Sequence, residues 1–158
     1  FLCVVGKSNN HLGNSKYMTI VHNKEDGGTP EIDLDEELKN GHFVLELINK
    51  QLVESSHDVG EGGILIAVAE MCIAGNLGIT IDEDKEFSHR FYFGEDQSRY
   101  LLEIRPENFD QLKQLSESKN VFFEKLGVVD QAIIKINNLN EIKVSELRNN
   151  FERGVGNI

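Results

Sequence analysis

The feature that most constrains the fold is a long apolar run, 64–74, which follows a glycine-rich turn. Only Glu70 interrupts the run, and Gly75 ends it. The run predicts a helix, and a helix that is hydrophobic all round is buried on both sides. The segments 52–59 and 77–81, before and after it, have the composition of short strands. We therefore expect a layered domain in which this helix packs on a sheet.

Helical and extended patterns continue along the rest of the chain. Helices are predicted from Asp33 to Leu52, with a possible break at Gly41, and after Pro106 and Ser145. Strands are predicted at 1–5, 91–93, 100–104, 121–129 and 132–136, with a short strand or extended crossover at 17–21 and a hairpin connection at 130–131. The fold class is therefore α+β: a mixed, mainly antiparallel sheet with helices packed on it.

A polar stretch from His22 to Pro30 has the composition of a linker, with Gly27 and Gly28 as breakers. We expect residues 1–29 to be the end of a preceding domain with its linker, and residues 30–158 to form the C-terminal domain. The chain opens on the apolar strand at 1–5 without an initiator Met. This indicates a piece of a longer polypeptide.

Charge and cysteine content exclude several classes of protein. The net charge is −11, whereas nucleic-acid binding needs clustered Lys and Arg. No apolar run approaches the roughly 18 residues of a membrane span. Cys3 and Cys72 both lie in apolar runs, without the spacing of a metal site or a disulfide framework. We therefore expect no nucleic-acid or membrane partner, and a reducing, cytoplasmic location.

The first candidate site joins a predicted strand to the apolar helix, and its candidate residues are His57, Asp58, Glu61, Gly62 and Gly63. Glycines before a helix let backbone N–H groups converge on an anion such as phosphate. The two carboxylates would repel a bare phosphate, so a bridging Mg²⁺ would be needed. The alternative is that Glu61 caps the helix and the glycines only form the turn.

The second candidate site follows at 94–99, and its candidate residues are Glu95, Asp96, Gln97, Ser98 and Arg99. Acceptors, an amide and a guanidinium are crowded here between two predicted apolar strands. Such a stretch suits a polyol, a ribose or a hydrated Mg²⁺. It is equally typical of a solvated hairpin tip.

Together these segments resemble a known family. The ordered pattern is Ser56-His57-Asp58-x-x-Glu61-Gly62-Gly63 opening the apolar helix, followed by Phe93-Gly94-Glu95-Asp96-Gln97-Ser98-Arg99-Tyr100. It is similar to the last domain of the synthetase part of formylglycinamide ribonucleotide amidotransferases, which belong to the aminoimidazole ribonucleotide synthetase superfamily. The motif Val5-Gly6-x-x-x-x-His11-Leu12-Gly13-x-Ser15-x-Tyr17 resembles the end of the preceding domain. Ser56 and Gly60 depart from the family, which more often has Ala and Ser there.

The resemblance implies a C-terminal fragment of an ATP-dependent carbon–nitrogen ligase of de novo purine synthesis. In that family ATP or ADP and Mg²⁺ are bound, and ammonia from a glutaminase domain or subunit converts formylglycinamide ribonucleotide into formylglycinamidine ribonucleotide. The catalytic histidine and most ligands lie in other parts of the polypeptide, so no catalytic residue is assigned here. The triplet Glu95-Asp96-Gln97 matches a substrate-contacting triplet of the family's first domain pair, and in this second copy it is expected to face an auxiliary nucleotide site.

Two alternatives stay open on the sequence alone. The first is a domain of another ATP-using superfamily member, such as a selenophosphate or thiamine phosphate enzyme. The second is a non-catalytic module that docks a partner through its acidic surface.

Overall fold

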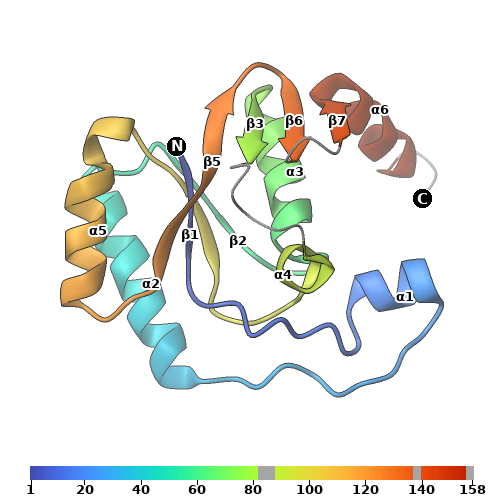
Figure 1. The fold of residues 1–158 in the computed structure, drawn as a ribbon, viewed down its shortest axis with the longest axis horizontal. Coiled ribbons are helices and arrows are strands. Elements are labelled where there is room, and N and C mark those ends of the chain that lie inside the picture. Colours follow the sequence, from blue (N-terminus) through green and yellow to red (C-terminus); the bar gives the residue numbers. More distant parts are fainter. Residues whose placement is uncertain (82–87, 137–139, 156–158) are drawn as a thin grey trace.

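The computed structural model describes residues 1–81, 88–136 and 140–155. In this part of the chain seven strands form one sheet, in the order β2-β4-β1-β5-β3-β6-β7 (Figure 1). The strands are β1 (Leu2–Val5), β2 (Ser55–Asp58), β3 (Gly78–Ile81), β4 (Tyr100–Glu103), β5 (Phe123–Asp130), β6 (Ile133–Ile136) and β7 (Asn140–Lys143).

The sheet is mixed and mainly antiparallel, as the sequence predicts. β1 pairs antiparallel with both β4 and β5, so β4 and β5 run in the same direction on either side of it. The pairs β2–β4, β3–β5 and β6–β7 are also antiparallel, and β3–β6 is parallel. The connections β4-α5-β5 and β2-α3-β3 are therefore crossovers between parallel strands that other strands separate.

Helices cover both faces of the sheet (Figure 1). The helices are α1 (Lys16–His22), α2 (Leu34–Asn49), α3 (Gly63–Gly75), α4 (His89–Phe93), α5 (Phe109–Ser118) and α6 (Val144–Val155), with a 3₁₀ turn η1 (Pro106–Asn108). Side chains of β1 alternate between the layers, since Leu2 and Val4 pack with α3 whereas Cys3 and Val5 pack with α2. Among the described residues, no helix is long and apolar enough to cross a membrane.

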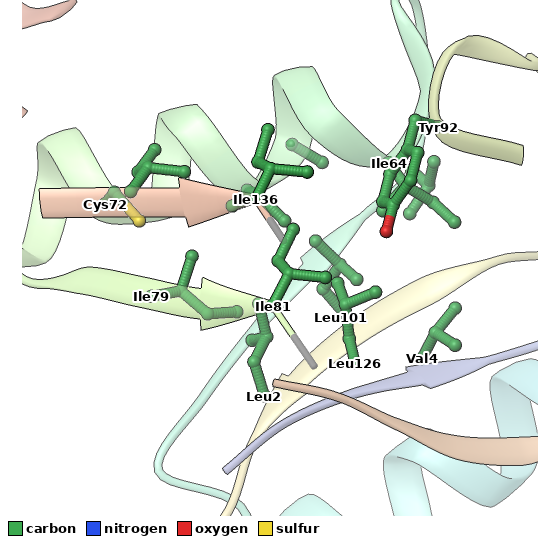
Figure 2. Close-up of a cluster of buried hydrophobic side chains, with 14 of the residues drawn as sticks. Leu2, Val4, Ile64, Cys72, Ile79, Ile81, Tyr92, Leu101, Leu126 and Ile136 are labelled. Carbon is green, nitrogen blue, oxygen red and sulfur yellow. The ribbon is translucent and has the colours of Figure 1, made fainter. Parts of the chain in front are cut away.

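The helix α3 supplies much of one core. Ile64, Val68 and Cys72 are buried in one hydrophobic cluster with side chains of β3 and β6. Figure 2 shows Ile64 and Cys72 of this cluster together with Ile79, Ile81 and Ile136. The opposite side of α3 is not covered in the described part of the chain, because Ile66 is 41% exposed. The expectation that this helix is buried on both sides is therefore wrong for this chain, in which α3 lies in an outer layer.

The local reasons for two helices are clear. Asp33 begins α2 by accepting hydrogen bonds from the backbone N–H groups of Asp35 and Glu36, as expected of an N-cap. The helix runs without a break through Gly41, so the predicted break is wrong. The segment 17–21 is the helix α1 rather than a strand, and Ser15 caps it.

Two further local predictions are wrong. The segment 91–93 belongs to the helix α4, which Ser88 caps, and is not a strand. The residues 130–131 do not form a hairpin, because β3 lies between β5 and β6 in the sheet. The last helix begins at Val144, immediately after a strand, β7, that the sequence did not predict.

The sheet extends across the predicted division between residues 1–29 and 30–158. β1, from the first part, lies at the centre of the sheet that the second part forms. β1 therefore belongs structurally with the later strands. The division itself stays a prediction.

Candidate functional site

The two candidate segments meet at a cleft of about 400 Å³, called the cleft below. Its floor is formed where β2 and β4 approach the start of α3, and the residues before α2 form its other side. The cleft is lined by Gly13, Asn14, Thr29, Pro30, Glu37, Asp58, Val59, Gly60, Glu61, Glu95, Gln97, Ser98, Arg99 and Tyr100. Six of the ten predicted site residues are among them.

Glu95 links the two candidate segments through hydrogen bonds. Its Oε1 atom accepts hydrogen bonds from the backbone N–H of Gly62 at 2.8 Å and of Lys16 at 2.7 Å. The Glu95 N–H donates to the carbonyl of His11 at 3.1 Å. A carboxylate thus already occupies the positive end of α3, which argues against a phosphate cradle at this turn.

Glu61 does not cap α3, contrary to the alternative interpretation of the sequence. Its carboxylate is exposed and lies 3.4 Å from the Lys16 ammonium. The N-cap residue is Gly62, which has no side-chain hydrogen bond of its own. The capping role passes to Glu95, which is distant in sequence.

The turn itself requires both of its last glycines. Gly62 and Gly63 have φ of +83° and +74°, a region that L side chains rarely adopt. A Cβ atom on Gly63 would lie 2.6 Å from the carbonyl oxygen of Gly94. These glycines therefore let α3 start against the second candidate segment.

Asp96 and Arg99 are buried and hold the loop in place, although Arg99 also contributes to the lining of the cleft. The Asp96 carboxylate accepts hydrogen bonds from the Ser8 hydroxyl at 3.0 Å, the Asn10 N–H at 3.1 Å and the His11 N–H at 3.3 Å. Arg99 donates from Nε to the Asp96 carbonyl at 3.1 Å and from Nη2 to the Gly94 carbonyl at 2.5 Å. The interpretation of this segment as a solvated hairpin tip is therefore wrong.

The charge on Arg99 is opposed by its burial. Burial lowers the pKa of Arg99, and the nearby carboxylates of Asp96 and Glu95 act in the opposite direction. The Nη1 atom is 3.9 Å from Asp96 Oδ2 and makes no hydrogen bond. Arg99 is thus held in place by its attraction to the Asp96 carboxylate and by hydrogen bonds to backbone carbonyls.

Ser98 and Gln97 differ in their surroundings. The Ser98 hydroxyl donates to the carbonyl of Glu36 at 3.1 Å and accepts from Asn40 Nδ2 at 3.0 Å, which ties the loop to α2. Gln97 is exposed in the cleft, with a 3.4 Å contact from Nε2 to the Glu95 carbonyl. Gln97 is therefore the member of this loop whose side chain is most available to a ligand.

His57 does not join the cleft. Alternation along β2 directs it to the face covered by α3, where its Nε2 lies 3.6 Å from Glu70 Oε2. It lines a separate, mostly apolar groove of about 380 Å³ that also includes Met71 and Cys72. Its neighbour Asp58 lies on the other side, in the cleft.

Sequence reasoning missed other residues of the cleft, notably Glu37 and Tyr100. Burial raises the pKa of Tyr100, and the carboxylates of Glu37 and Asp58 raise it further. No ligand role is predicted for either residue, because Glu37 lies in the acidic first turn of α2 and Tyr100, although it ends the second motif, has the pattern of an ordinary strand residue. Within 1–81, 88–136 and 140–155, no group of three or more His, Cys, Asp or Glu side chains is placed to hold a metal ion.

Comparison with known proteins defines the class first. Residues 2–134 match the model of the AIR synthase related protein, C-terminal domain, and the chain belongs to this family. The phosphoribosylformylglycinamidine synthase subunit PurL of Pelagibacter ubique is 35% identical over 148 residues, covering 92% of this chain and 20% of the relative. The corresponding subunit of Bartonella quintana is 34% identical, covering 96% and 21%. The chain thus spans about a fifth of the length of these relatives.

Solved structures support the predicted fold. The PurL of T. maritima complexed with FGAR has a TM-score of 0.74 at 20% identity, covering 93% of this chain and 27% of that one. The same protein complexed with ATP has a TM-score of 0.72 at 19% identity, covering 93% and 25%. A thiamine-monophosphate kinase from Stenotrophomonas maltophilia is less similar, with a TM-score of 0.56 at 15% identity, covering 85% and 49%.

Proposed function

We propose that this chain is the C-terminal domain of a PurL-type phosphoribosylformylglycinamidine synthase, a carbon–nitrogen ligase of purine synthesis. The observation that carries the proposal is the match to PurL subunits along almost the whole chain. The full polypeptide then uses ATP and ammonia to convert formylglycinamide ribonucleotide into formylglycinamidine ribonucleotide. This domain supplies part of the scaffold and one wall of a ligand site.

The chemistry of the cleft suits hydroxyl groups better than phosphate. Asp58, Glu61 and Glu95 give the cleft negative charge, and Gln97 adds an amide. Carboxylate and amide oxygens accept hydrogen bonds from ribose hydroxyls, whereas they repel phosphate oxygens. We therefore assign the cleft to the ribose side of an auxiliary nucleotide, with the phosphates held by other parts of the polypeptide.

The partners in this proposal are the rest of the synthetase polypeptide and a glutaminase domain or subunit, in the cytoplasm. ATP or ADP and Mg²⁺ belong to the full-length enzyme. The described residues of this chain do not fit a Mg²⁺ site by themselves, since no suitable group of carboxylates is present. Any metal ion would need ligands from outside this domain.

Gln97→Ala in the full-length enzyme tests the assignment. Because Gln97 is exposed and lines the cleft, its removal should leave the melting temperature of the apoprotein unchanged. It should lower the amount of nucleotide retained after purification by several-fold, with little change in the Michaelis constant for substrate. Gln111→Ala, at an exposed position on α5 away from the cleft, is the matched control. A large fall in turnover with unaltered melting would instead place Gln97 at the working site.

A further inference from the structure

The helix α2 has two apolar faces, and only one of them is covered by the described part of the chain. Asn40, Phe43, Val44 and Leu47 are buried against the sheet. A second row is exposed and is called the α2 stripe below. Its members are Leu34, Leu38, Leu45 and Ile48, whose exposed fractions are 70%, 59%, 53% and 44%. At about 100° per residue the α2 stripe is centred roughly 130° around the helix from the buried face.

The spacing of the α2 stripe is that of a helix–helix seam. With Gly41 included, successive members are separated by four, three, four and three residues, the alternation by which one helix packs along another. The row extends for about 21 Å along the helix axis. Contiguous exposed apolar rows of this kind mark interaction surfaces in proteins.

The α2 stripe lies beside the cleft. A Cβ atom on Gly41 would be 3.5 Å from the Tyr100 hydroxyl, and Tyr100 lines the cleft together with Glu37 of the same helix. A structure that covers the stripe would therefore also form the rim of the cleft. The two surfaces are continuous.

We propose that the α2 stripe docks an amphipathic helix from the rest of the synthetase polypeptide. The proposal rests on the proposed function in one respect, that this chain is part of such a polypeptide. The curated relatives are about five times longer than the matched region, so most of their chain lies outside it. The start of α2 carries Asp35, Glu36 and Glu37, so the docked helix should bear Lys or Arg opposite Leu34.

Cysteine labelling of the full-length protein tests whether the stripe is covered. Leu38→Cys and Leu45→Cys should react with a maleimide at least tenfold more slowly than Gln111→Cys and Gln114→Cys. The two control positions are exposed and polar, and they lie on α5, away from the stripe. Equal labelling rates at all four positions would overturn the proposal.

Photo-crosslinking identifies the occupant. A benzophenone amino acid replaces Leu45 in full-length protein, prepared as a mixture of isotopically heavy and light copies. The expected product joins position 45 to a helical segment outside residues 1–158 of the same copy. A product that mixes heavy and light peptides, a product with another protein, or no product would each overturn the proposal.

These measurements are independent of turnover and nucleotide. If Gln97→Ala kept its nucleotide, the role of the cleft would fail while the labelling pattern stood. If the stripe were labelled as fast as the control positions, the proposal of a docked helix would be contradicted, and the assignment of the cleft would be unaffected.

Discussion

At the scale of single residues, Asp96 and Arg99 form a buried pair of opposite charges. The Asp96 carboxylate accepts hydrogen bonds from Ser8, Asn10 and His11. It also lies beside the buried guanidinium of Arg99. Asp96→Ala would leave those donors without an acceptor and Arg99 without its nearest counter-charge. We expect the free energy of unfolding to fall by about 3–5 kcal/mol.

Urea unfolding of the variant and the parent measures this change. Gln97→Ala, one residue away but exposed, should stay within roughly 0.5 kcal/mol of the parent. If both substitutions shifted the midpoint equally, the loop would not depend on the buried pair.

Cys72 gives a prediction about pH. Burial raises the pKa of Cys72 from 9.0 to about 11. At pH 8 the native thiol should then be ionised roughly a hundredth as often as an unperturbed one, and a thiol reagent should react correspondingly slowly. Because the folded pKa is raised, burial of Cys72 favours the folded state only while the thiol is protonated. Its stabilising effect is therefore complete below the unfolded pKa and is lost as pH rises through about 11.

The rate of reaction with a disulfide reagent at pH 8, with and without urea, checks the prediction for Cys72. Denaturation should restore ordinary reactivity. Rapid modification of Cys72 in the native protein would contradict it. The Cys3→Ser variant removes the second buried thiol from the assay.

Residue-level prediction failed where partners are distant in sequence. Asp96 is a candidate ligand contact whose carboxylate also accepts hydrogen bonds from a loop 85–88 positions earlier, a pairing that the sequence does not predict. Glu95 likewise accepts a hydrogen bond from the N–H of Gly62, the N-cap residue of α3, which is 33 positions before it. No local pattern reports such pairings, so the sequence singled out the segment without distinguishing its buried members from the exposed Gln97.

At the scale of elements, the turn into α3 depends on Gly63. Gly63→Ala would place a Cβ against the backbone of Phe93 and Gly94 at a positive φ. We expect a loss of about 1–3 kcal/mol of stability from backbone strain, measured by thermal or urea unfolding. Gly75→Ala, at the other end of α3, meets no atom within 4 Å and should be neutral or slightly stabilising.

This comparison also decides between two roles for the turn. A Gly63→Ala variant that melted normally but lost nucleotide would contradict the structural role. The turn would then be a ligand cradle despite the carboxylate of Glu95.

Element prediction succeeded where periodicity was long and failed where segments were short. The helices α2 and α3 each show many residues of their pattern, and both were predicted. The helices α1 and α4 have only seven and five residues, too few for a helical period to be distinguished from an apolar strand. Aromatic and β-branched residues, such as Tyr17, Ile20 and Phe91, biased both toward strand.

At the scale of the whole molecule, the chain should be inactive alone. It spans about a fifth of its PurL relatives, and its described residues hold no metal cluster. Ligases of this type must bring both reactants together, which one wall of a cleft does not do. Specific ATP-dependent product formation by the purified 158-residue chain, assayed beside the full-length enzyme, would contradict the prediction.

The class of fold was predictable from the sequence, but the order of the strands was not. Alternation and turn residues predicted an antiparallel sheet with helices on it. The separation of β5 and β6 by β3 depends on pairing across long stretches of chain. Short sequence windows, such as the one that suggested a hairpin at 130–131, do not contain that information.

The central position of β1 has a consequence for how the chain folds. Leu2 pairs with Glu103 and Val5 pairs with Phe123, so β1 fills the gap between two strands that follow it by about a hundred residues or more. These contacts close very large loops, which slows folding in proteins dominated by such pairings. During synthesis on the ribosome, β1 has no partner strand until β4 and β5 have emerged. We therefore expect the complete sheet to form only after translation of β5. In this order of events β1 joins last and connects the β2–β4 pair to the strands that begin with β5.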